Sequence, residues 1–107
     1  MSKKDGYTKE QLMVSGFAKA LAHPARLVIL KILFERTNCT VNEIVHELPL
    51  AQSTVSRHLK ELKEAGLLKY KIEAPKIFYT INHQEFALSK QLLNSFFEME
   101  KVELGVD

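Results

Sequence analysis

The sequence has little of what marks several large classes of protein. Its 107 residues include no tryptophan and a single cysteine, Cys39, so no internal disulfide can form. No apolar run reaches the roughly 18 residues needed to cross a membrane, and the first ten residues lack the apolar segment of a secretory signal. We therefore expect a soluble, cytoplasmic protein without a membrane partner.

Catalytic signatures are missing as well. The sequence shows no serine–histidine–aspartate or cysteine–histidine arrangement for nucleophilic catalysis, and its four glycines do not form a phosphate-binding loop. We expect a protein that is not an enzyme and that needs no cofactor.

The composition is that of one globular domain with an uneven charge distribution. With 46% hydrophobic and 26% charged residues, the chain fits a single domain spanning residues 1–107. Residues 50–82 carry an excess of three positive charges, whereas residues 83–107 carry an excess of three negative charges. A basic segment of this kind is typical of a nucleic-acid-binding surface, although an ordinary mixed-charge surface gives a difference of the same size.

Residues Gln52–Gly66 form the most informative segment. Val55, Leu59 and Leu62 follow one another at the spacing of an apolar helix stripe. The opposite side is rich in hydroxyls and then cationic, so it can offer donors to phosphates and base edges. The residues on that side are Ser53, Ser56, Arg57 and Lys60. Gly66 suits the left-handed residue that ends a helix, and an ordinary amphipathic surface helix is the alternative for this segment alone.

Two helices are predicted at the start of the chain. The first, over about residues 8–21, opens with a capping box formed by Thr8 and Gln11. The second begins at Pro24, because proline suits the first position of a helix. It is apolar nearly all round as far as Phe34, which predicts a place in the centre of the core.

A helix-turn-helix is predicted over residues 41–66. A second capping box, Thr40 with Glu43, opens a short third helix that Pro49 ends. A short helix, a tight turn and an amphipathic helix with a basic outer face are the parts of this motif.

A β-hairpin, or wing, is predicted over residues 67–82. Apolar and polar side chains alternate along residues 68–72 and 77–81, and a four-residue turn joins the two runs. The lysines that would lie beside the recognition helix, where a duplex backbone runs, are Lys69, Lys71 and Lys76. Lysine is also common on exposed strand edges, where it keeps a protein soluble.

The last predicted helix, over about residues 83–102, is apolar around about half of its circumference. One side can cover its own domain, while the other needs a partner, for which the similarly apolar first helix of a second copy is the natural choice. The residues that we assign to this dimer interface are Leu12, Phe17, Leu88, Leu92, Phe96 and Met99. A terminal helix that wraps its own core is the alternative.

These elements predict a mainly α fold with a small β-hairpin (α+β), a winged helix-turn-helix in the order α-α-α-α-β-β-α. Four segments also carry a family likeness: Leu21–Leu30 (LAHPARLVIL), Val41–Leu48 (VNEIVHEL), Gln52–Leu68 (QSTVSRHLKELKEAGLL) and Ile77–Asn82 (IFYTIN). They resemble the ArsR/SmtB family of bacterial winged-helix repressors, and the resemblance covers about residues 10–100.

The resemblance implies a homodimer built on the first and last helices, which binds an imperfect palindrome in double-stranded DNA and usually represses transcription. It also implies that the wing touches the minor groove or backbone beside the recognition helix. The recognition-helix positions that it brings near DNA are Gln52, Ser53, Thr54, Ser56, Arg57 and His58.

The sequence departs from the metal sites that the resemblance would imply. One such site uses cysteines at the start of the third helix, where Thr40 and Asn42 stand here and Cys39 lies one residue off the pattern. The other uses aspartate and histidines between paired last helices. The matching residues here are Asn82, Gln84, Ser95 and Glu98. Zinc-like ions need several imidazole or thiolate ligands, so we expect no metal site.

The cysteine and the histidines have simple structural interpretations. Cys39 is interpreted as a partly buried small side chain rather than a thiol switch, because only a symmetry-related Cys39 could pair with it. His23 fits helix entry, His46 a surface position, and His83 the start of the last helix. For His58, at the edge of the apolar stripe, a phosphate contact and a packed flank are both open.

The sequence thus predicts a dimeric, sequence-specific DNA-binding transcriptional regulator, which we expect to act as a repressor, with helix 52–66 in the major groove. Phosphate contacts from lysines would make its affinity depend on salt. The predicted DNA contacts are Gln52, Ser53, Thr54, Ser56, Arg57, His58, Lys60, Lys69, Lys71 and Lys76. The alternative is a winged-helix interaction module whose basic face meets an acidic protein.

Overall fold

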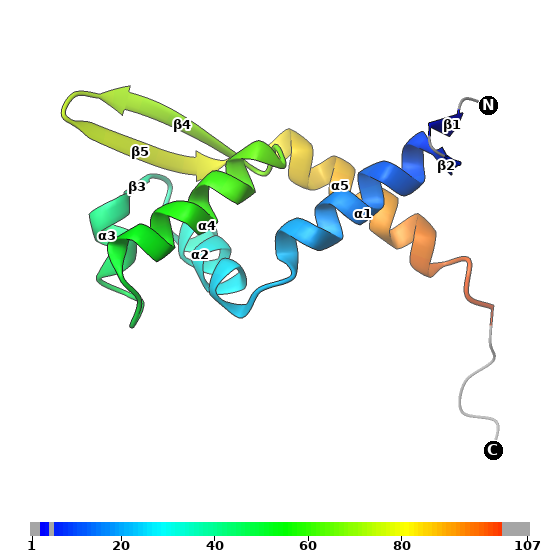
Figure 1. Ribbon diagram of the computed structural model, residues 1–107, viewed down its shortest axis with the longest axis horizontal. Coiled ribbons are helices and arrows are strands. Elements are labelled where there is room, and N and C mark those ends of the chain that lie inside the picture. Colours follow the sequence, from blue (N-terminus) through cyan, green and yellow to red (C-terminus); the bar gives the residue numbers. More distant parts are fainter. Residues whose placement is uncertain (1–2, 5, 102–107) are drawn as a thin grey trace, which may run out of the picture.

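The structure is a computed structural model that describes residues 3–4 and 6–101. Helices α2, α3 and α4 gather with a β-hairpin at one end of the molecule, while α1 and α5 cross at the other (Figure 1). The helices of the described residues are α1 (Lys9–Leu21), α2 (Pro24–Glu35), α3 (Val41–Val45), α4 (Gln52–Glu64) and α5 (His83–Phe97). The strands are β1 (Lys3–Lys4), β2 (Tyr7–Thr8), β3 (Cys39–Thr40), β4 (Leu68–Glu73) and β5 (Lys76–Ile81). This is the predicted α+β winged-helix fold.

Both predicted capping boxes are present. The Gln11 amide donates to the Thr8 hydroxyl over 3.1 Å, and the Thr8 amide donates back to the Gln11 side chain over 3.0 Å. The same reciprocal pair joins Thr40 and Glu43, at 2.8 and 3.2 Å, and these bonds from Thr40 hold the pKa of Glu43 below its usual value. These local contacts satisfy amides that every helix start leaves without a partner.

A histidine caps helix α2 and an asparagine caps helix α5. His23 accepts a hydrogen bond at Nδ1 from the Ala25 amide over 3.0 Å, so it is the N-cap of α2. Asn82 caps α5 by accepting from the Glu85 amide over 3.3 Å.

Gly66 ends the recognition helix α4 as predicted. Its φ of +86° lies in the left-handed region that side chains disfavour. The Gly66 amide donates to the Lys63 carbonyl over 2.9 Å, and the Leu67 amide donates to the Leu62 carbonyl over 3.0 Å. This pair of bonds is a Schellman motif, which turns the chain directly from α4 into β4.

The wing belongs to a three-stranded antiparallel sheet in the order β3-β5-β4. Strands β4 and β5 pair along their whole length, from Leu68 opposite Ile81 to Glu73 opposite Lys76. Strand β3 was not predicted; it places Cys39 opposite Tyr79 and lies immediately before α3. A strand of two residues is too short to show alternation, so the sequence pattern could not reveal it. The β1–β2 pair was not predicted for the same reason.

The core lies between α1, α2, α3, α4 and the base of the wing. Its most enclosed side chains are Ile29, Cys39, Ile44, Val55, Leu59, Leu62 and Leu67. Phe17 is also part of this core and is only 5% exposed, which corrects its assignment to the dimer interface. The Phe17 ring points inward because α1 packs on α2 and α4 there, whereas Leu12, five residues earlier on another side of the helix, is 43% exposed.

Helix α2 is only half buried, contrary to the prediction that it would fill the centre of the core. Ile29 and Leu33 face inward, while Leu27 and Phe34 are 53% and 59% exposed. Helix α2 packs against α1, α4 and β5, and the side that these elements do not cover stays exposed within a single chain.

Two helices are shorter than predicted. Helix α3 ends at Val45, and the next residues form a tight turn in which Leu48 donates to the Val45 carbonyl, because the following Pro49 disfavours a helix. Helix α5 ends at Phe97, where acidic residues oppose the negative end of the helix dipole. The predicted end at residue 102 lies outside the described residues. No helix in the described part of the chain is both long and apolar enough to cross a bilayer.

Candidate nucleic-acid interface

Helix α4 separates an apolar inner face from a polar outer face. Val55, Leu59 and Leu62 are fully enclosed against α2, α3 and the first residues of the wing. The residues that are exposed on the outer face are Gln52, Ser53, Arg57 and Lys60. Thr54 and Ser56 are half-buried at its flanks. The outer face can therefore present hydroxyl, amide and guanidinium donors together.

The first turn of α4 also leaves main-chain donors open. Its N-cap is Ala51, which has no side-chain oxygen to accept from the helix amides. Main-chain amides at a helix start favour an anion, so this end of α4 is chemically suited to a phosphate oxygen beside Gln52 and Ser53.

His58 lies inside the protein and is removed from the set of predicted DNA contacts. Only 4% of its surface is exposed, and its ring centroid lies 4.4 Å from that of His23. Arg26 donates from Nε to Nδ1 of His58 over 3.1 Å. Burial, and then the neighbouring His23, Arg26 and Arg57, lower the pKa of His58. The sequence left both a phosphate contact and a packed position open for His58, and the structure shows the packed position.

The wing carries the predicted lysines on its surface. Lys69, Lys71 and Lys76 are all exposed. The Lys71 Nζ lies 2.9 Å from a Glu73 carboxylate oxygen, an exposed pair that contributes little to stability. Sequence analysis missed Lys63, whose Nζ lies 4.2 Å from the centre of the Tyr70 ring and so adds a cation at the junction of helix and wing.

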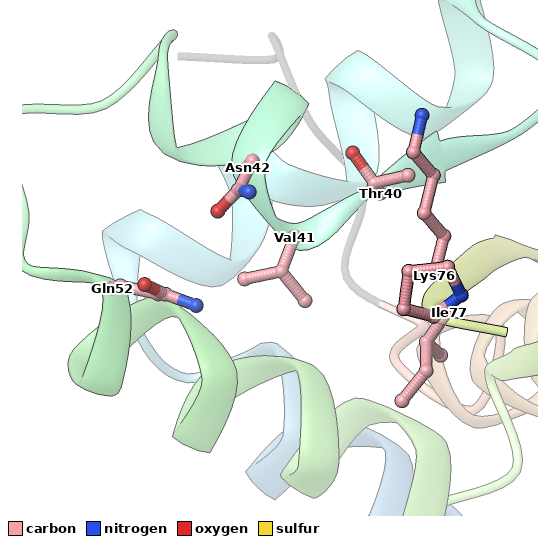
Figure 2. Close-up of a pocket in the computed structure, with 7 residues that line it drawn as sticks. Thr40, Val41, Asn42, Gln52, Lys76 and Ile77 are labelled. Carbon is pink, nitrogen blue, oxygen red and sulfur yellow. The ribbon is translucent and has the colours of Figure 1, made fainter.

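A cleft of about 240 Å³ separates the wing tip from the helix-turn-helix. Figure 2 shows Asn42 of α3 and Gln52 of α4 on one side of it, and Lys76 of the wing on the other. The cleft is lined by Thr40, Val41, Asn42, Gln52, Pro75, Lys76 and Ile77. Its polar side chains come from β3, α3, α4 and β5, and the contribution of β5 lies more than 30 residues away in sequence, so Asn42 could not be recognised from its neighbours.

A second, apolar surface lies away from the wing, where α1 and α5 cross (Figure 1). Phe96 is 53% and Met99 is 73% exposed, while Leu88 and Leu92 are half-buried. A groove of about 490 Å³ runs between the two helices. Its lining residues are Thr8, Glu10, Gln11, Val14, Ser15, Leu92, Ser95, Phe96 and Met99.

Within the described residues, no three histidine, cysteine or acidic side chains come together as a possible metal site. Asn82, one of the residues that match the family's metal ligands, already uses its side-chain oxygen to cap α5. Cys39 is fully enclosed, and burial, followed by the nearby Glu43, raises the pKa of its thiol. A buried, protonated thiol is a poor metal ligand and a poor nucleophile.

A short helix, a turn, an exposed polar helix and an antiparallel wing beside it define the winged helix-turn-helix class of DNA-binding proteins. Residues 23–70 match the family described as "Bacterial regulatory protein, arsR family". The chain belongs to this ArsR family and is a transcriptional regulator rather than an enzyme.

Individual relatives agree with this assignment. The chain is 37% identical over 76 residues to the transcriptional repressor PagR of Bacillus anthracis, which covers 71% of this chain and 76% of PagR. It is 35% identical over 79 residues to the transcriptional activator HlyU of Vibrio cholerae, covering 74% of this chain and 72% of HlyU.

Solved structures show the same fold. The structure of reduced HlyU from Vibrio cholerae has a TM-score of 0.66 and 31% identity, covering 82% of this chain and 93% of HlyU. The crystal structure of a possible transcriptional regulator for arsenical resistance has a TM-score of 0.69 and 29% identity, covering 74% and 81% of the two chains.

Proposed function

We propose that this protein is a dimeric regulator that binds a specific, imperfectly palindromic DNA sequence and represses transcription. One observation carries the proposal: the outer face of α4 is free, cationic and rich in hydrogen-bond donors, and an exposed basic wing stands beside it. An α-helix fits the major groove, where base edges present distinct donor and acceptor patterns.

In this proposal, different parts of the surface formed by α4 and the wing contact different parts of the DNA. Arg57 reads a base edge, because its planar guanidinium can donate two hydrogen bonds to one guanine. The other α4 contacts are Gln52, Ser53, Thr54, Ser56 and Lys60. The wing lysines and the open amides at the start of α4 hold the phosphate backbone and set the register of the helix.

The second copy would cover the apolar surface formed by α1 and α5. Phe96 and Met99 are large, exposed and contiguous with the groove between these helices, and burying such a patch is strongly favourable. A two-fold dimer built here would place both α4 helices toward one side of a duplex, about 34–36 Å apart. Leu12, Leu88 and Leu92 complete the proposed interface.

Relatives support regulation and differ in its direction. PagR is named a repressor and HlyU an activator, while the biofilm growth-associated repressor of Agrobacterium fabrum is 34% identical over 89 residues. We propose repression for this chain, acting in the cytoplasm where a bacterial chromosome is accessible.

Selection from random duplexes followed by a binding titration tests the proposal. We expect an enriched sequence with two-fold symmetry, bound in the presence of excess random competitor and with an affinity that falls steeply as salt rises. Binding that competitor abolishes, or an affinity for acidic proteins in place of duplex DNA, would reject sequence-specific recognition.

A further inference from the structure

A hydrogen-bonded link joins the back of the recognition helix to the end of α1. Arg26, in the first turn of α2, donates from Nε to Nδ1 of His58 over 3.1 Å. Its Nη1 donates to the main-chain oxygens of Ala20 and Lys19, at 3.3 and 3.4 Å. A single guanidinium therefore contacts the last turn of α1 and the middle of α4 at the same time.

The link accepts only one protonation state of His58. Guanidinium can only donate hydrogen bonds, so Nδ1 of His58 must keep its lone pair free to accept. A proton on Nδ1 would set two donors against each other. Because His58 is only 4% exposed, water has little access to replace the lost partner, and an unsatisfied buried group is costly.

The surroundings of His58 are largely cationic. The charged and titratable groups around it are His23 and Arg26 from α2, and Arg57 and Glu61 from α4. Burial and the three basic neighbours lower the pKa of His58, while Glu61 alone opposes them. A proton placed on this ring would therefore enter an unfavourable site.

We propose that Arg26 and His58 are positioning residues for DNA reading, which hold α4 against α1 only while His58 is neutral. The proposal rests on the proposed DNA-binding function. Arg57 is the next residue on α4 and faces outward, so a shift of the helix at His58 displaces the side chain that reads DNA. Acidification thus releases the helix and weakens specific binding.

The direction in which acidification changes DNA affinity distinguishes the Arg26–His58 link from a simple effect of added positive charge. A proton added close to DNA raises the positive charge of the protein and by itself strengthens binding to phosphates. The Arg26–His58 link predicts the reverse, a specific affinity that falls as His58 gains its proton.

Operator affinity measured from about pH 7.5 down to about pH 4.5 tests the proposal, because the lowered pKa of His58 places its protonation below the ordinary histidine range. We expect the wild-type affinity to fall about fivefold, the factor that one hydrogen bond supports. In His58→Asn the amide oxygen replaces Nδ1 as the acceptor and does not titrate, so its affinity should change little. His46→Asn, at an exposed histidine, should follow the wild type.

A wild-type affinity that stays constant or rises on acidification overturns the proposal, and so does an equal fall in His58→Asn. If His58→Asn does not fold, the sign of the wild-type profile still decides.

Hydrogen exchange of the protein alone tests the link without DNA. Acidification should lower the protection factors of α4 amides in the wild type and leave them in His58→Asn. If no duplex is bound at any pH, the proposed function fails, while unchanged α4 protection in the wild type would overturn the Arg26–His58 link itself.

Discussion

At the scale of residues, neighbours on α4 have opposite environments. Arg57 is exposed, whereas His58, the next residue, is 4% exposed and bonded to Arg26. Helical periodicity places His58 at the edge of the apolar stripe and leaves both outcomes open. Arg26 decides between them, and its contact with His58 spans 32 residues of sequence, which no local pattern encodes.

We expect Arg57→Ala to weaken specific DNA binding by about 1–3 kcal/mol, the range for a side chain that bonds one base with two donors. Its side chain is exposed and packs into no core, so the free energy of unfolding should change by less than about 0.5 kcal/mol. Titrations against the selected operator and a scrambled duplex measure both effects.

Lys90→Ala is the matched control, since it removes an exposed cation from α5. An equal loss on both duplexes would identify Arg57 as a phosphate contact, and no loss on either would remove it from the interface.

At the scale of elements, the sequence predicted the features that depend on nearby residues and not those that depend on contacts between distant segments. The capping boxes at Thr8 and Thr40 depend on residues three positions apart, and the hairpin depends on alternation within a dozen residues. The pairing of Cys39 with Tyr79 joins segments 40 residues apart, so β3 left no mark in the local sequence. Phe17 shows the same limit, because an apolar helix has two faces and only its packing partners distinguish core from surface.

The end of α4 provides a test at this scale. Gly66→Ala should destabilise the protein by about 1–2 kcal/mol, the cost of the left-handed conformation for a residue with a side chain. An added Cβ would lie 3.6 Å from the Glu85 side chain, an ordinary contact, so the backbone conformation accounts for the loss. Denaturant unfolding at one protein concentration measures it.

Gly16→Ala is the opposite case, since a Cβ there meets nothing within 4 Å and the residue lies inside helix α1. It should stabilise the protein by about 0.5–1 kcal/mol. A loss of the same size at both glycines would contradict the explanation by backbone conformation.

At the scale of the whole molecule, the two proposed binding surfaces lie at opposite ends. Helix α4 and the wing occupy one end, and α1 and α5 cross at the other (Figure 1). In the proposed dimer, this separation would let the α1–α5 surface be buried against a second copy while the face of α4 stays available to DNA.

Assembly through the apolar surface can be tested by adding charge to it. Phe96→Glu or Leu92→Glu should shift the protein from dimer to monomer in sedimentation at micromolar concentration, because a buried unpaired carboxylate is costly. Ile72→Glu, the same kind of change at a 62% exposed wing residue, should leave the dimer intact. A stable wild-type monomer would contradict the proposed assembly.

Metal ions should not release this protein from DNA. Stoichiometric zinc, cobalt, cadmium or arsenite finds one buried cysteine per chain, and Asn82, Gln84 and Ser95 supply neutral oxygens that poorly replace imidazole. Titration calorimetry at neutral pH should give heats at the level of buffer. One tightly bound ion per chain, coupled to loss of DNA binding, would show that His83, Glu85 or a partner chain builds a different site.

The short strand β3 has a consequence for the spacing of DNA half-sites that the protein can bind. It pairs the segment before α3 with β5, and the Schellman turn at Gly66 joins the end of α4 to β4, so each helix of the helix-turn-helix is connected to one strand of the wing. We therefore expect the reading helix and the wing of one chain to move together as one unit. In the proposed dimer, the distance between the two reading helices then depends on how α1 and α5 pack across the interface. That packing would set the spacing between half-sites that the protein accepts in an operator.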